Sequence, residues 1–309
     1  MDSIVEKKII STELLPEECK ELFKKFIIID KDIKEQDLQE AIALMTWPGL
    51  ITKELLDKMK NLKIIQTFSA GVDDLNFSII PRNIIILSNA GAYSIPVAEH
   101  AWAIALALAK GVGLKKKIKV KKITNSKILI LGCGGIGSEI ARIGKLAFNT
   151  YNIGVSRSFQ KPELFDEKYS ELQILNSIIP KVDIIFNTLP LNKYTKSILN
   201  YDNLKYCKNN SIIVNVGRGE TVDENGIYRL LKERPDIRFG TDVFWRRNGI
   251  EDFNTKLWEL ENFTGTLHTA GAYGSEEVRK DAIISACKNL AMYLNEGKIR
   301  NLVKFEDYI

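Results

Sequence analysis

Cysteine and histidine are scarce in this sequence of 309 residues, and their scarcity limits the chemistry that can be expected. The four cysteines form no Cys-x-x-Cys pair, so neither a disulfide framework nor a zinc site is expected, and a reducing compartment fits best. They are Cys19, Cys133, Cys207 and Cys287. With only two histidines, a metal site rich in histidine is not expected either. The sequence therefore predicts no bound metal.

Long apolar segments are also missing. Residues 1–10 lack the apolar core that signal peptides carry. The most apolar stretch, Val97–Leu108, includes Glu99 and His100 and is too short to span a bilayer. We therefore expect a cytoplasmic protein that has no membrane partner.

The net charge of +5 does not describe the whole chain. Six of the 44 basic residues lie within Lys115–Lys122, and without them the 39 acidic residues are in slight excess. A nucleic-acid site usually spreads basic residues over a face and places aromatic residues among them, and this run has no aromatic residue. We expect no nucleic-acid partner and interpret the run as a solvated connector.

Short apolar runs alternate with helical patterns, which predicts parallel β-α-β units. The expected strands are Lys8–Ile10, Phe26–Ile29, Ile42–Met45, Leu62–Thr67, Ile84–Leu87, Lys127–Leu131, Thr150–Val155, Val182–Asn187, Ser211–Val216, Ile237–Thr241 and Gly265–Leu267. The length corresponds to about two domains. We expect an α/β protein with one domain formed by residues 1–96 and 277–309 and another by residues 97–276.

A glycine-rich turn follows the expected strand Lys127–Leu131. It reads Gly132-Cys133-Gly134-Gly135-Ile136-Gly137 and precedes an expected helix, as the Gly-x-Gly-x-x-Gly dinucleotide-binding motif requires. The first glycine allows the tight turn, the second lets the backbone approach a pyrophosphate, and the third permits close packing of helix on strand. The helix N-terminus then offers N–H donors to the phosphates. These residues predict a dinucleotide site.

The end of the next strand indicates which dinucleotide is preferred. NAD sites usually have an acidic residue there, which binds the ribose 2′-hydroxyl. This sequence has Ser156-Arg157-Ser158 instead, and an arginine with two hydroxyls suits a 2′-phosphate. The alternative is that Arg157 is a solvated side chain in a polar loop. We predict that NADP is preferred and that NAD remains possible.

Further motifs, together with the glycine turn, resemble the D-isomer-specific 2-hydroxyacid dehydrogenases along nearly the whole chain. They are Ser69-Ala70-Gly71-Val72-Asp73, Val97-Ala98-Glu99-His100, Asn187-Thr188-Leu189-Pro190 with Thr195, Val214-Asn215-Val216-Gly217-Arg218-Gly219, Thr241-Asp242-Val243-Phe244, and His268. The resemblance implies two Rossmann-like, doubly wound parallel-sheet domains with the active site in the cleft between them. It also implies a homodimer.

The same resemblance implies roles for individual residues. Arg218 would bind the substrate carboxylate and polarise the 2-oxo group, and His268 would give a proton to the developing alkoxide. The alternatives are a structural ion pair for Arg218 and a structural role for His268. The backbone amides of Ala70, Gly71 and Val72 would bind the carboxylate. The implied cofactor contacts are Thr188, Leu189, Pro190, Thr195, Val216 and Asp242.

One departure from the family pattern concerns the partner of His268. The family places a carboxylate five residues after the aspartate of the Asp-Val-Phe motif, where it raises the pKa of the histidine. Here that position is Arg247, and a nearby arginine would lower the histidine pKa. Glu251 or Asp252 is a candidate substitute, although both are also ordinary loop acids.

These residues predict NADPH-dependent or NADH-dependent reduction of a small 2-oxo acid such as glyoxylate or hydroxypyruvate. Three alternatives remain open. The enzyme is slow or shifted to low pH for want of a partner to His268, or it oxidises formate, which requires no proton donor. Related formate enzymes usually place glutamine where the glutamate is lost, and this loop has none. The third alternative is a nucleotide-sensing regulator or binding module.

Overall fold

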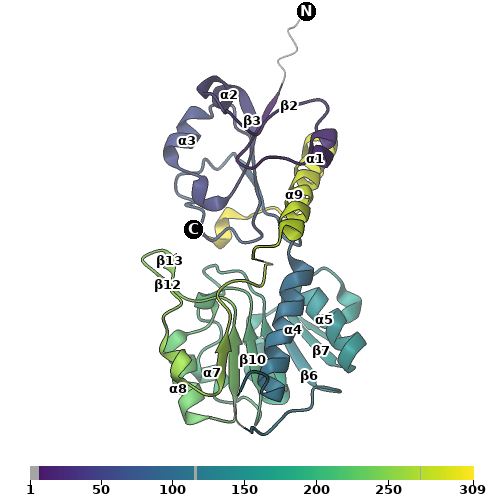
Figure 1. The fold of residues 1–309 in the computed structure, drawn as a ribbon, viewed down its shortest axis with the longest axis vertical. Helices are drawn as coiled ribbons and strands as arrows, with labels where there is room; N and C mark the ends of the chain where they lie inside the picture. Colours follow the sequence, from purple (N-terminus) through teal and green to yellow (C-terminus); the bar gives the residue numbers. More distant parts are fainter. Residues whose placement is uncertain (1–6, 115–116, 272) are drawn as a thin grey trace, which may run out of the picture. The chain divides into compact units, whose positions relative to one another are not determined.

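The computed structural model describes residues 7–114, 117–271 and 273–309, and the chain divides into two units (Figure 1). Unit 1 comprises Met1–Ala92 with Gly274–Ile309, and unit 2 comprises Tyr93–Tyr273. Each unit has its own parallel sheet. Among the described residues, no helix has the length and apolar character needed to cross a membrane.

Unit 1 is built around five parallel strands in the order β2-β1-β3-β4-β5. The strands are β1 (Lys8–Ser11), β2 (Ile27–Ile29), β3 (Ala41–Thr46), β4 (Ile64–Thr67) and β5 (Ile85–Leu87). The helices are α1 (Glu17–Leu22), α2 (Glu35–Glu40), α3 (Lys53–Lys58) and α9 (Glu276–Glu296). Apolar side chains of α1 and α9 pack on one face of the sheet, and those of α2 and α3 pack on the other. All five strands were expected from the apolar runs.

A disulfide corrects the expectation drawn from cysteine spacing. Cys19 in α1 and Cys287 in α9 are bonded, with their Cα atoms 5.6 Å apart, although 268 positions separate them in the sequence. Both side chains are fully buried. The spacing argument failed because it considers only cysteines that are close in sequence, whereas unit 1 is assembled from both ends of the chain.

Unit 2 contains a sheet of seven parallel strands in the order β14-β11-β10-β9-β6-β7-β8. The strands are β6 (Lys127–Cys133), β7 (Tyr151–Phe159), β8 (Glu167–Tyr169), β9 (Ile184–Asn187), β10 (Ile212–Asn215), β11 (Arg238–Thr241) and β14 (Phe263–Gly265). The helices are α4 (Ser94–Lys110), α5 (Gly135–Phe148), α6 (Leu175–Ile178), α7 (Tyr201–Leu204) and α8 (Glu224–Glu233). A short antiparallel hairpin, β12 (Arg246–Arg247) with β13 (Ile250–Glu251), lies outside this sheet.

The strand order of unit 2 reverses at β6, which pairs with β7 on one side and β9 on the other. Helices α4 and α5 pack on one face of the sheet, and α6, α7 and α8 pack on the other (Figure 1). In doubly wound sheets, ligands bind beyond the carboxyl ends of the strands at such a reversal. The glycine turn after β6 lies at this point.

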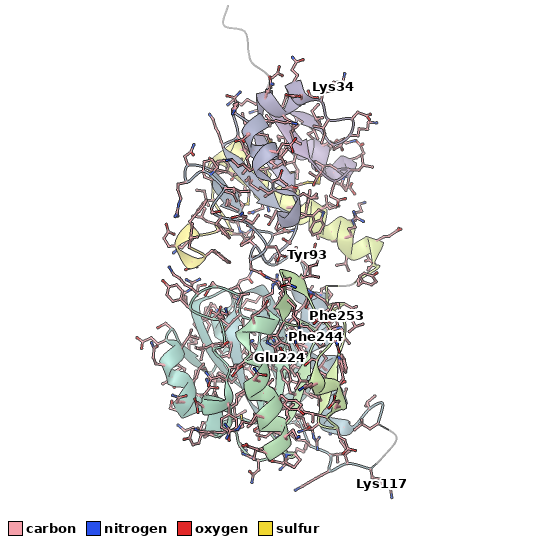
Figure 2. The ribbon with its side chains drawn as sticks, turned by 90° about the vertical axis from the view of Figure 1, so that its left-hand side faces the viewer. Lys34, Tyr93, Lys117, Glu224, Phe244 and Phe253 are labelled. Atoms are coloured by element: carbon pink, nitrogen blue, oxygen red, sulfur yellow. A yellow bond between two sulfur atoms is a disulfide. The ribbon has the colours of Figure 1, made fainter. Side chains whose placement is uncertain are left out.

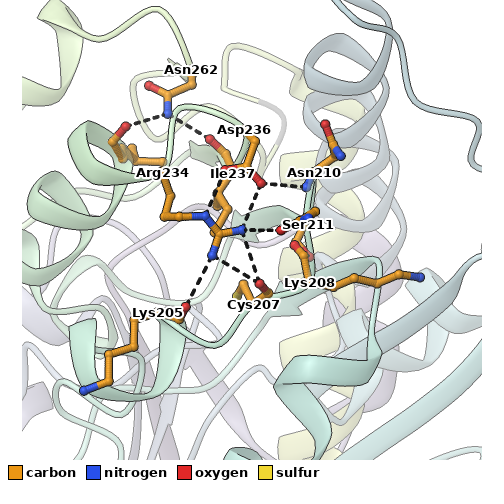
Figure 3. A network of polar contacts seen from close by, with 11 residues as sticks. Lys205, Cys207, Lys208, Asn210, Ser211, Arg234, Asp236, Ile237 and Asn262 are labelled. Carbon is orange, nitrogen blue, oxygen red and sulfur yellow. Dashed lines mark hydrogen bonds and ion pairs between the residues drawn. The ribbon is translucent and has the colours of Figure 1, made fainter.

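Polar contacts connect the loops at the amino ends of β10 and β11, the end of the sheet opposite to the glycine turn. Arg234 forms two hydrogen bonds with Asp236 and reaches the carbonyl oxygens of Lys205 and Cys207 (Figure 3). Lys115 and Lys116 of the lysine run lie outside the described residues. Lys121 departs from the expected solvated connector, because its ammonium group pairs with Asp183 at 3.2 Å and its side chain is 14% exposed.

The disulfide predicts that the denatured, unreduced chain exposes two thiols, those of Cys133 and Cys207, and that reduction exposes four. It also predicts that replacing Cys19 and Cys287 with alanine removes about 2–5 kcal/mol of unfolding free energy, because the cross-link restricts the unfolded chain. Thiol titration in denaturant and thermal melting with and without reductant measure these effects. Reductant should lower the melting temperature of the wild type and leave that of the double variant unchanged. Four reactive thiols before reduction would contradict the cross-link.

Candidate active site

The glycine turn after β6 has the geometry of a dinucleotide cradle. Gly132 has a φ of +86°, and a Cβ there would lie 2.8 Å from the Thr188 hydroxyl oxygen. A Cβ on Gly137 would lie 2.0 Å from the Gly132 carbonyl oxygen, so α5 approaches the turn too closely for any side chain. A Cβ on Gly134 would meet nothing within 4 Å, which leaves the backbone open to a ligand. These features fit a pyrophosphate at the N-terminus of α5.

The predicted 2′-phosphate residues adjoin this turn. Leu131 pairs with Val155 and Cys133 pairs with Phe159, so Ser156-Arg157-Ser158 forms a bulge opposite the single residue Gly132. Arg157 and Ser158 are exposed, and Ser156 is half-buried. The register shift places these three residues beside the glycine turn and outside the regular pairing of β7. A bulge also redirects the side chains it contains.

The segment that carries Arg218 is held by two buried asparagines at the ends of neighbouring strands. Asn187 donates a hydrogen bond to the Asn215 side-chain oxygen at 3.0 Å and another to the Thr221 hydroxyl at 2.6 Å. Asn215 donates to the Arg218 carbonyl oxygen at 2.9 Å and accepts from the Gly217 N–H at 3.2 Å. This network fixes the backbone on both sides of Arg218.

The remaining residues predicted to contact the cofactor are gathered at the same end of the sheet. The Thr188 hydroxyl donates to the carbonyl oxygens of Leu131 and Gly132, which ties the end of β9 to the glycine turn. A Cβ on Gly217 would lie 2.4 Å from the Leu189 carbonyl oxygen. The Thr195 hydroxyl donates to the Pro190 carbonyl oxygen at 2.6 Å and is buried within its loop. Val216 is also buried and follows β10 directly.

Asp242 organises the segment that carries His268. Its side chain is 2% exposed, and its carboxylate accepts hydrogen bonds from the Thr266 hydroxyl and from the N–H groups of Thr269 and Ala270. The His268 N–H donates to the Asp242 carbonyl oxygen at 2.7 Å. His268 has a φ of +54°, a left-handed conformation that non-glycine residues adopt only when their surroundings enforce it.

The histidine on α4 takes part in the same network. The His100 Nε2 atom lies 2.7 Å from the Thr266 hydroxyl oxygen, and that hydroxyl is bonded to Asp242. His100 thus has a structural partner in Thr266. Thr266 was not singled out from the sequence, because no motif marks it. It links α4 to the aspartate that holds the His268 segment.

Glu251 occupies the position left open by the family pattern. Its Oε2 atom lies 2.6 Å from His268 Nδ1, and its Oε1 atom accepts a hydrogen bond from the Phe244 N–H at 2.6 Å. The Glu251 side chain is 20% exposed and that of His268 is 46% exposed. Of the two candidates named from the sequence, Glu251 therefore reaches the histidine, whereas Asp252 pairs with Arg247.

The two members of this pair favour their charged forms. The hydrogen bond to Glu251 raises the pKa of His268 above its ordinary value, although burial and the charge of Arg218 oppose this change. Burial is the largest influence on Glu251, but hydrogen bonds from His268 and the Phe244 N–H, together with the charge of Arg218, lower its pKa overall. A protonated imidazole beside a carboxylate is the arrangement of a general acid.

Arg247 does not act on the histidine as the sequence suggested. Its Nε atom lies 2.7 Å from an Asp252 carboxylate oxygen, and its Nη2 atom lies 3.1 Å from a Glu224 carboxylate oxygen. The influences on the His268 pKa come from Glu251, burial, Arg218 and Asp242. The alternative in which His268 lacks a partner is therefore wrong, because Glu251, further along the loop, bonds to it.

The predicted carboxylate-binding turn, Ala70–Val72, lies in unit 1, and Phe68 and Ser69 separate it from the end of β4. The Ser69 hydroxyl donates to the Gly71 carbonyl oxygen at 2.6 Å, and the Asn89 N–H donates to the Ser69 carbonyl oxygen at 2.9 Å. The Asn89 side chain also donates to the carbonyl oxygens of Phe68 and Ala282, which joins this turn to α9. Asn89 was not predicted from the sequence, since no motif includes it.

In the part of the chain that the structure describes, no group of three histidine, cysteine or acidic residues could hold a metal ion. Unit 2 carries the glycine turn and the side chains of Arg218, His268 and Glu251, and the charge of Arg218 influences the pKa of the other two. Together with the strand order, these features indicate a nucleotide-binding domain that also carries a hydrogen-bonded histidine and glutamate, His268 and Glu251.

Comparisons with known proteins agree with this class. Residues 90–270 match the model of the D-isomer specific 2-hydroxyacid dehydrogenase, NAD binding domain. Glyoxylate reductase of Thermococcus litoralis is 28% identical, over 96% of this chain and 96% of its own. Hydroxypyruvate reductase of Thermotoga maritima is 29% identical, over 75% of this chain and 78% of its own. The solved structure of a candidate formate dehydrogenase of Pyrobaculum aerophilum is 30% identical, with a TM-score of 0.81, and the match covers 98% of this chain and 100% of that one.

The chain belongs to the D-isomer specific 2-hydroxyacid dehydrogenase family, because the family model covers more than half of its length. The prediction of the family from its motifs is confirmed, and so is the α/β class with Rossmann-like parallel sheets. The match also identifies unit 2 as a domain that binds a nicotinamide cofactor, so the chain is an oxidoreductase by family.

Proposed function

We propose that this protein reduces a small 2-oxo acid, such as glyoxylate or hydroxypyruvate, to the corresponding 2-hydroxy acid. The observation that carries the proposal is the 2.6 Å contact between His268 and Glu251, with Arg218 close enough to influence the pKa of both. Relatives named glyoxylate reductase and hydroxypyruvate reductase support this substrate class.

The reaction adds one hydride and one proton to the C2 carbonyl group of the substrate. The hydride would come from a nicotinamide cofactor held at the glycine turn Gly132–Gly137. Protonated His268 donates its proton to the C2 oxygen as negative charge develops there, which yields the hydroxyl group. The Glu251 carboxylate stabilises the imidazolium before transfer and holds the ring by its Nδ1 atom, so that Nε2 is left for the substrate.

Arg218 is proposed to bind the substrate carboxylate. Its planar guanidinium group can bind a carboxylate through two parallel hydrogen bonds, and its positive charge polarises an adjacent 2-oxo group. The Asn187 and Asn215 network supports this role because it fixes the backbone from which the side chain extends. The turn amides of Ala70, Gly71 and Val72 are proposed as a second group of carboxylate donors.

Formate oxidation is the second candidate, favoured by the name of the similar Pyrobaculum aerophilum structure. That reaction removes only a hydride from formate and requires no group that donates a proton. The Glu251 carboxylate favours the protonated form of His268, which is the form needed to reduce a 2-oxo acid. We therefore place 2-oxo acid reduction first.

NADP is the proposed cofactor, with NAD as a possible alternative. The support is the bulge of Ser156, Arg157 and Ser158 beside the glycine turn, where two hydroxyls and a guanidinium group can bind a 2′-phosphate. No acidic residue occurs in this three-residue bulge to repel such a phosphate. We also propose a homodimer, in keeping with the family resemblance, and a cytoplasmic location stays a prediction.

Replacing Arg157 with alanine should weaken NADPH binding and leave NADH binding nearly unchanged, since only NADPH carries the 2′-phosphate. A lost charge-assisted contact of about 1.5–3 kcal/mol corresponds to roughly a tenfold to hundredfold rise in Kd for NADPH. Fluorescence titration with both cofactors measures the ratio. Equal binding of the two cofactors by the wild type, with no change of ratio in the variant, would contradict the proposed preference.

The wild type should oxidise NADPH in the presence of glyoxylate or hydroxypyruvate, and His268→Gln should lower kcat by about 10²–10⁴-fold, because proton transfer is lost. Arg218→Ala should chiefly raise KM for the 2-oxo acid. Absorbance at the nicotinamide band, followed with a panel of 2-oxo acids and with formate and NADP in the reverse direction, measures these activities.

Arg229→Ala is the control for Arg218→Ala, because Arg229 is an exposed arginine of α8 that pairs with Glu233. It should retain wild-type kinetics. Unchanged turnover in both His268→Gln and Arg218→Ala would contradict the mechanism. Activity with formate alone would favour the second candidate, and tight cofactor binding without any turnover would favour a nucleotide-sensing protein.

A further inference from the structure

Arg247 extends from the face of the β12–β13 hairpin opposite to the face that carries Glu251. In this antiparallel hairpin Arg246 pairs with Glu251, and Arg247 pairs with Ile250. Paired residues share a face, and successive residues alternate between faces. The pairing therefore directs Glu251 to one side, where it meets His268, and Arg247 to the other.

On its own side, Arg247 joins two carboxylates that come from different segments. Its Nη2 atom lies 3.1 and 3.2 Å from the two carboxylate oxygens of Glu224, the first residue of α8. Its Nε atom lies 2.7 Å from Asp252, which follows the hairpin. The Thr255 hydroxyl donates to Glu224 at 3.0 Å and thereby holds that carboxylate in place. The guanidinium group thus connects the hairpin to the start of a helix.

The base of the hairpin is fixed independently of Arg247. The Asp252 N–H donates to the Trp245 carbonyl oxygen at 2.9 Å, and the rings of Phe244 and Phe253 lie 5.3 Å apart, edge to face. Figure 2 shows Glu224, Phe244 and Phe253 together in unit 2. The base can therefore keep the hairpin folded, while the link to Glu224 sets the direction in which it projects from the base.

We propose that Arg247 is a positioning residue, which acts through Glu224 and Asp252 to hold the hairpin so that the Glu251 carboxylate stays at His268. The effect of Arg247 on catalysis rests on the proposed function, in which His268 donates a proton to the substrate. An ion pair this exposed contributes little to folding, since the Arg247 side chain is 52% exposed. Its effect lies in orientation, because small displacements of a catalytic group are costly to the rate.

The state of His268 can be measured without any substrate. The chain has only two histidines, so histidine labelled with carbon-13 at Cε1 gives two resonances, and the His268→Gln variant identifies the one from His268. The charged groups that influence this histidine are Glu251, Arg218 and Asp242, and replacement of Arg247 leaves all three in the chain. A change in the titration therefore reports a change in their placement.

In Arg247→Met the His268 titration should move to lower pH, by part of the displacement that Glu251→Gln causes. Arg247→Lys should move it less, because a lysine keeps the charge and can still reach one carboxylate. Arg229→Met is the matched control, since Arg229 lies on α8, the helix that begins at Glu224, and its Nε atom pairs with Glu233 at 2.8 Å. It should titrate as the wild type does.

A wild-type titration in Arg247→Met, alongside a displaced one in Glu251→Gln, would overturn the proposal. If Arg247→Met fails to fold, the double variant Glu224→Gln with Asp252→Asn should show the same displacement, and a wild-type titration there would overturn it equally. Failure of the proposed function is distinguishable, because it would appear as absent 2-oxo acid reduction with the displacement intact.

Discussion

The hydrogen bond between His268 and Glu251 is the interaction on which the proposed function of this chain depends. It turns an exposed histidine, 46% accessible at its side chain, into a group that stays protonated to higher pH. Several buried elements serve this contact. Asp242 holds the backbone around His268 from within the domain, and the Phe244 N–H fixes the second oxygen of the Glu251 carboxylate.

The chain achieves this contact from an unusual place in the loop. Arg247 stands where the family resemblance led us to expect a carboxylate. The short β12–β13 hairpin places the Glu251 carboxylate at His268 instead. What the arrangement requires is a carboxylate oxygen next to the Nδ1 atom of His268. A carboxylate at a different position in the loop can meet this requirement. A loss of the usual residue in a motif is therefore weak evidence for lost catalysis when an acid lies a few positions further on.

Much of the fold follows from local sequence, because buried parallel strands are continuous apolar runs and the glycine turn has its own motif. The hairpin was missed although Asn248-Gly249, with φ values of +54° and +80°, is a strong turn signal that would have directed Glu251 backwards. It was missed because its two strands, β12 and β13, have only two residues each and therefore show no apolar periodicity. The pairing of Cys19 with Cys287 was beyond reach for another reason, because it depends on how the two ends of the chain fold together.

The most direct test of the central contact is the pH dependence of kcat/KM for 2-oxo acid reduction in the wild type and in Glu251→Gln. The proposed mechanism requires protonated His268, so we expect activity to be complete at low pH and to fall as the pH rises through the pKa of this histidine. The contact raises that pKa, and its loss should move the falling limb of the variant to lower pH. Falling limbs at the same pH in both proteins would show that Glu251 does not control the catalytic proton.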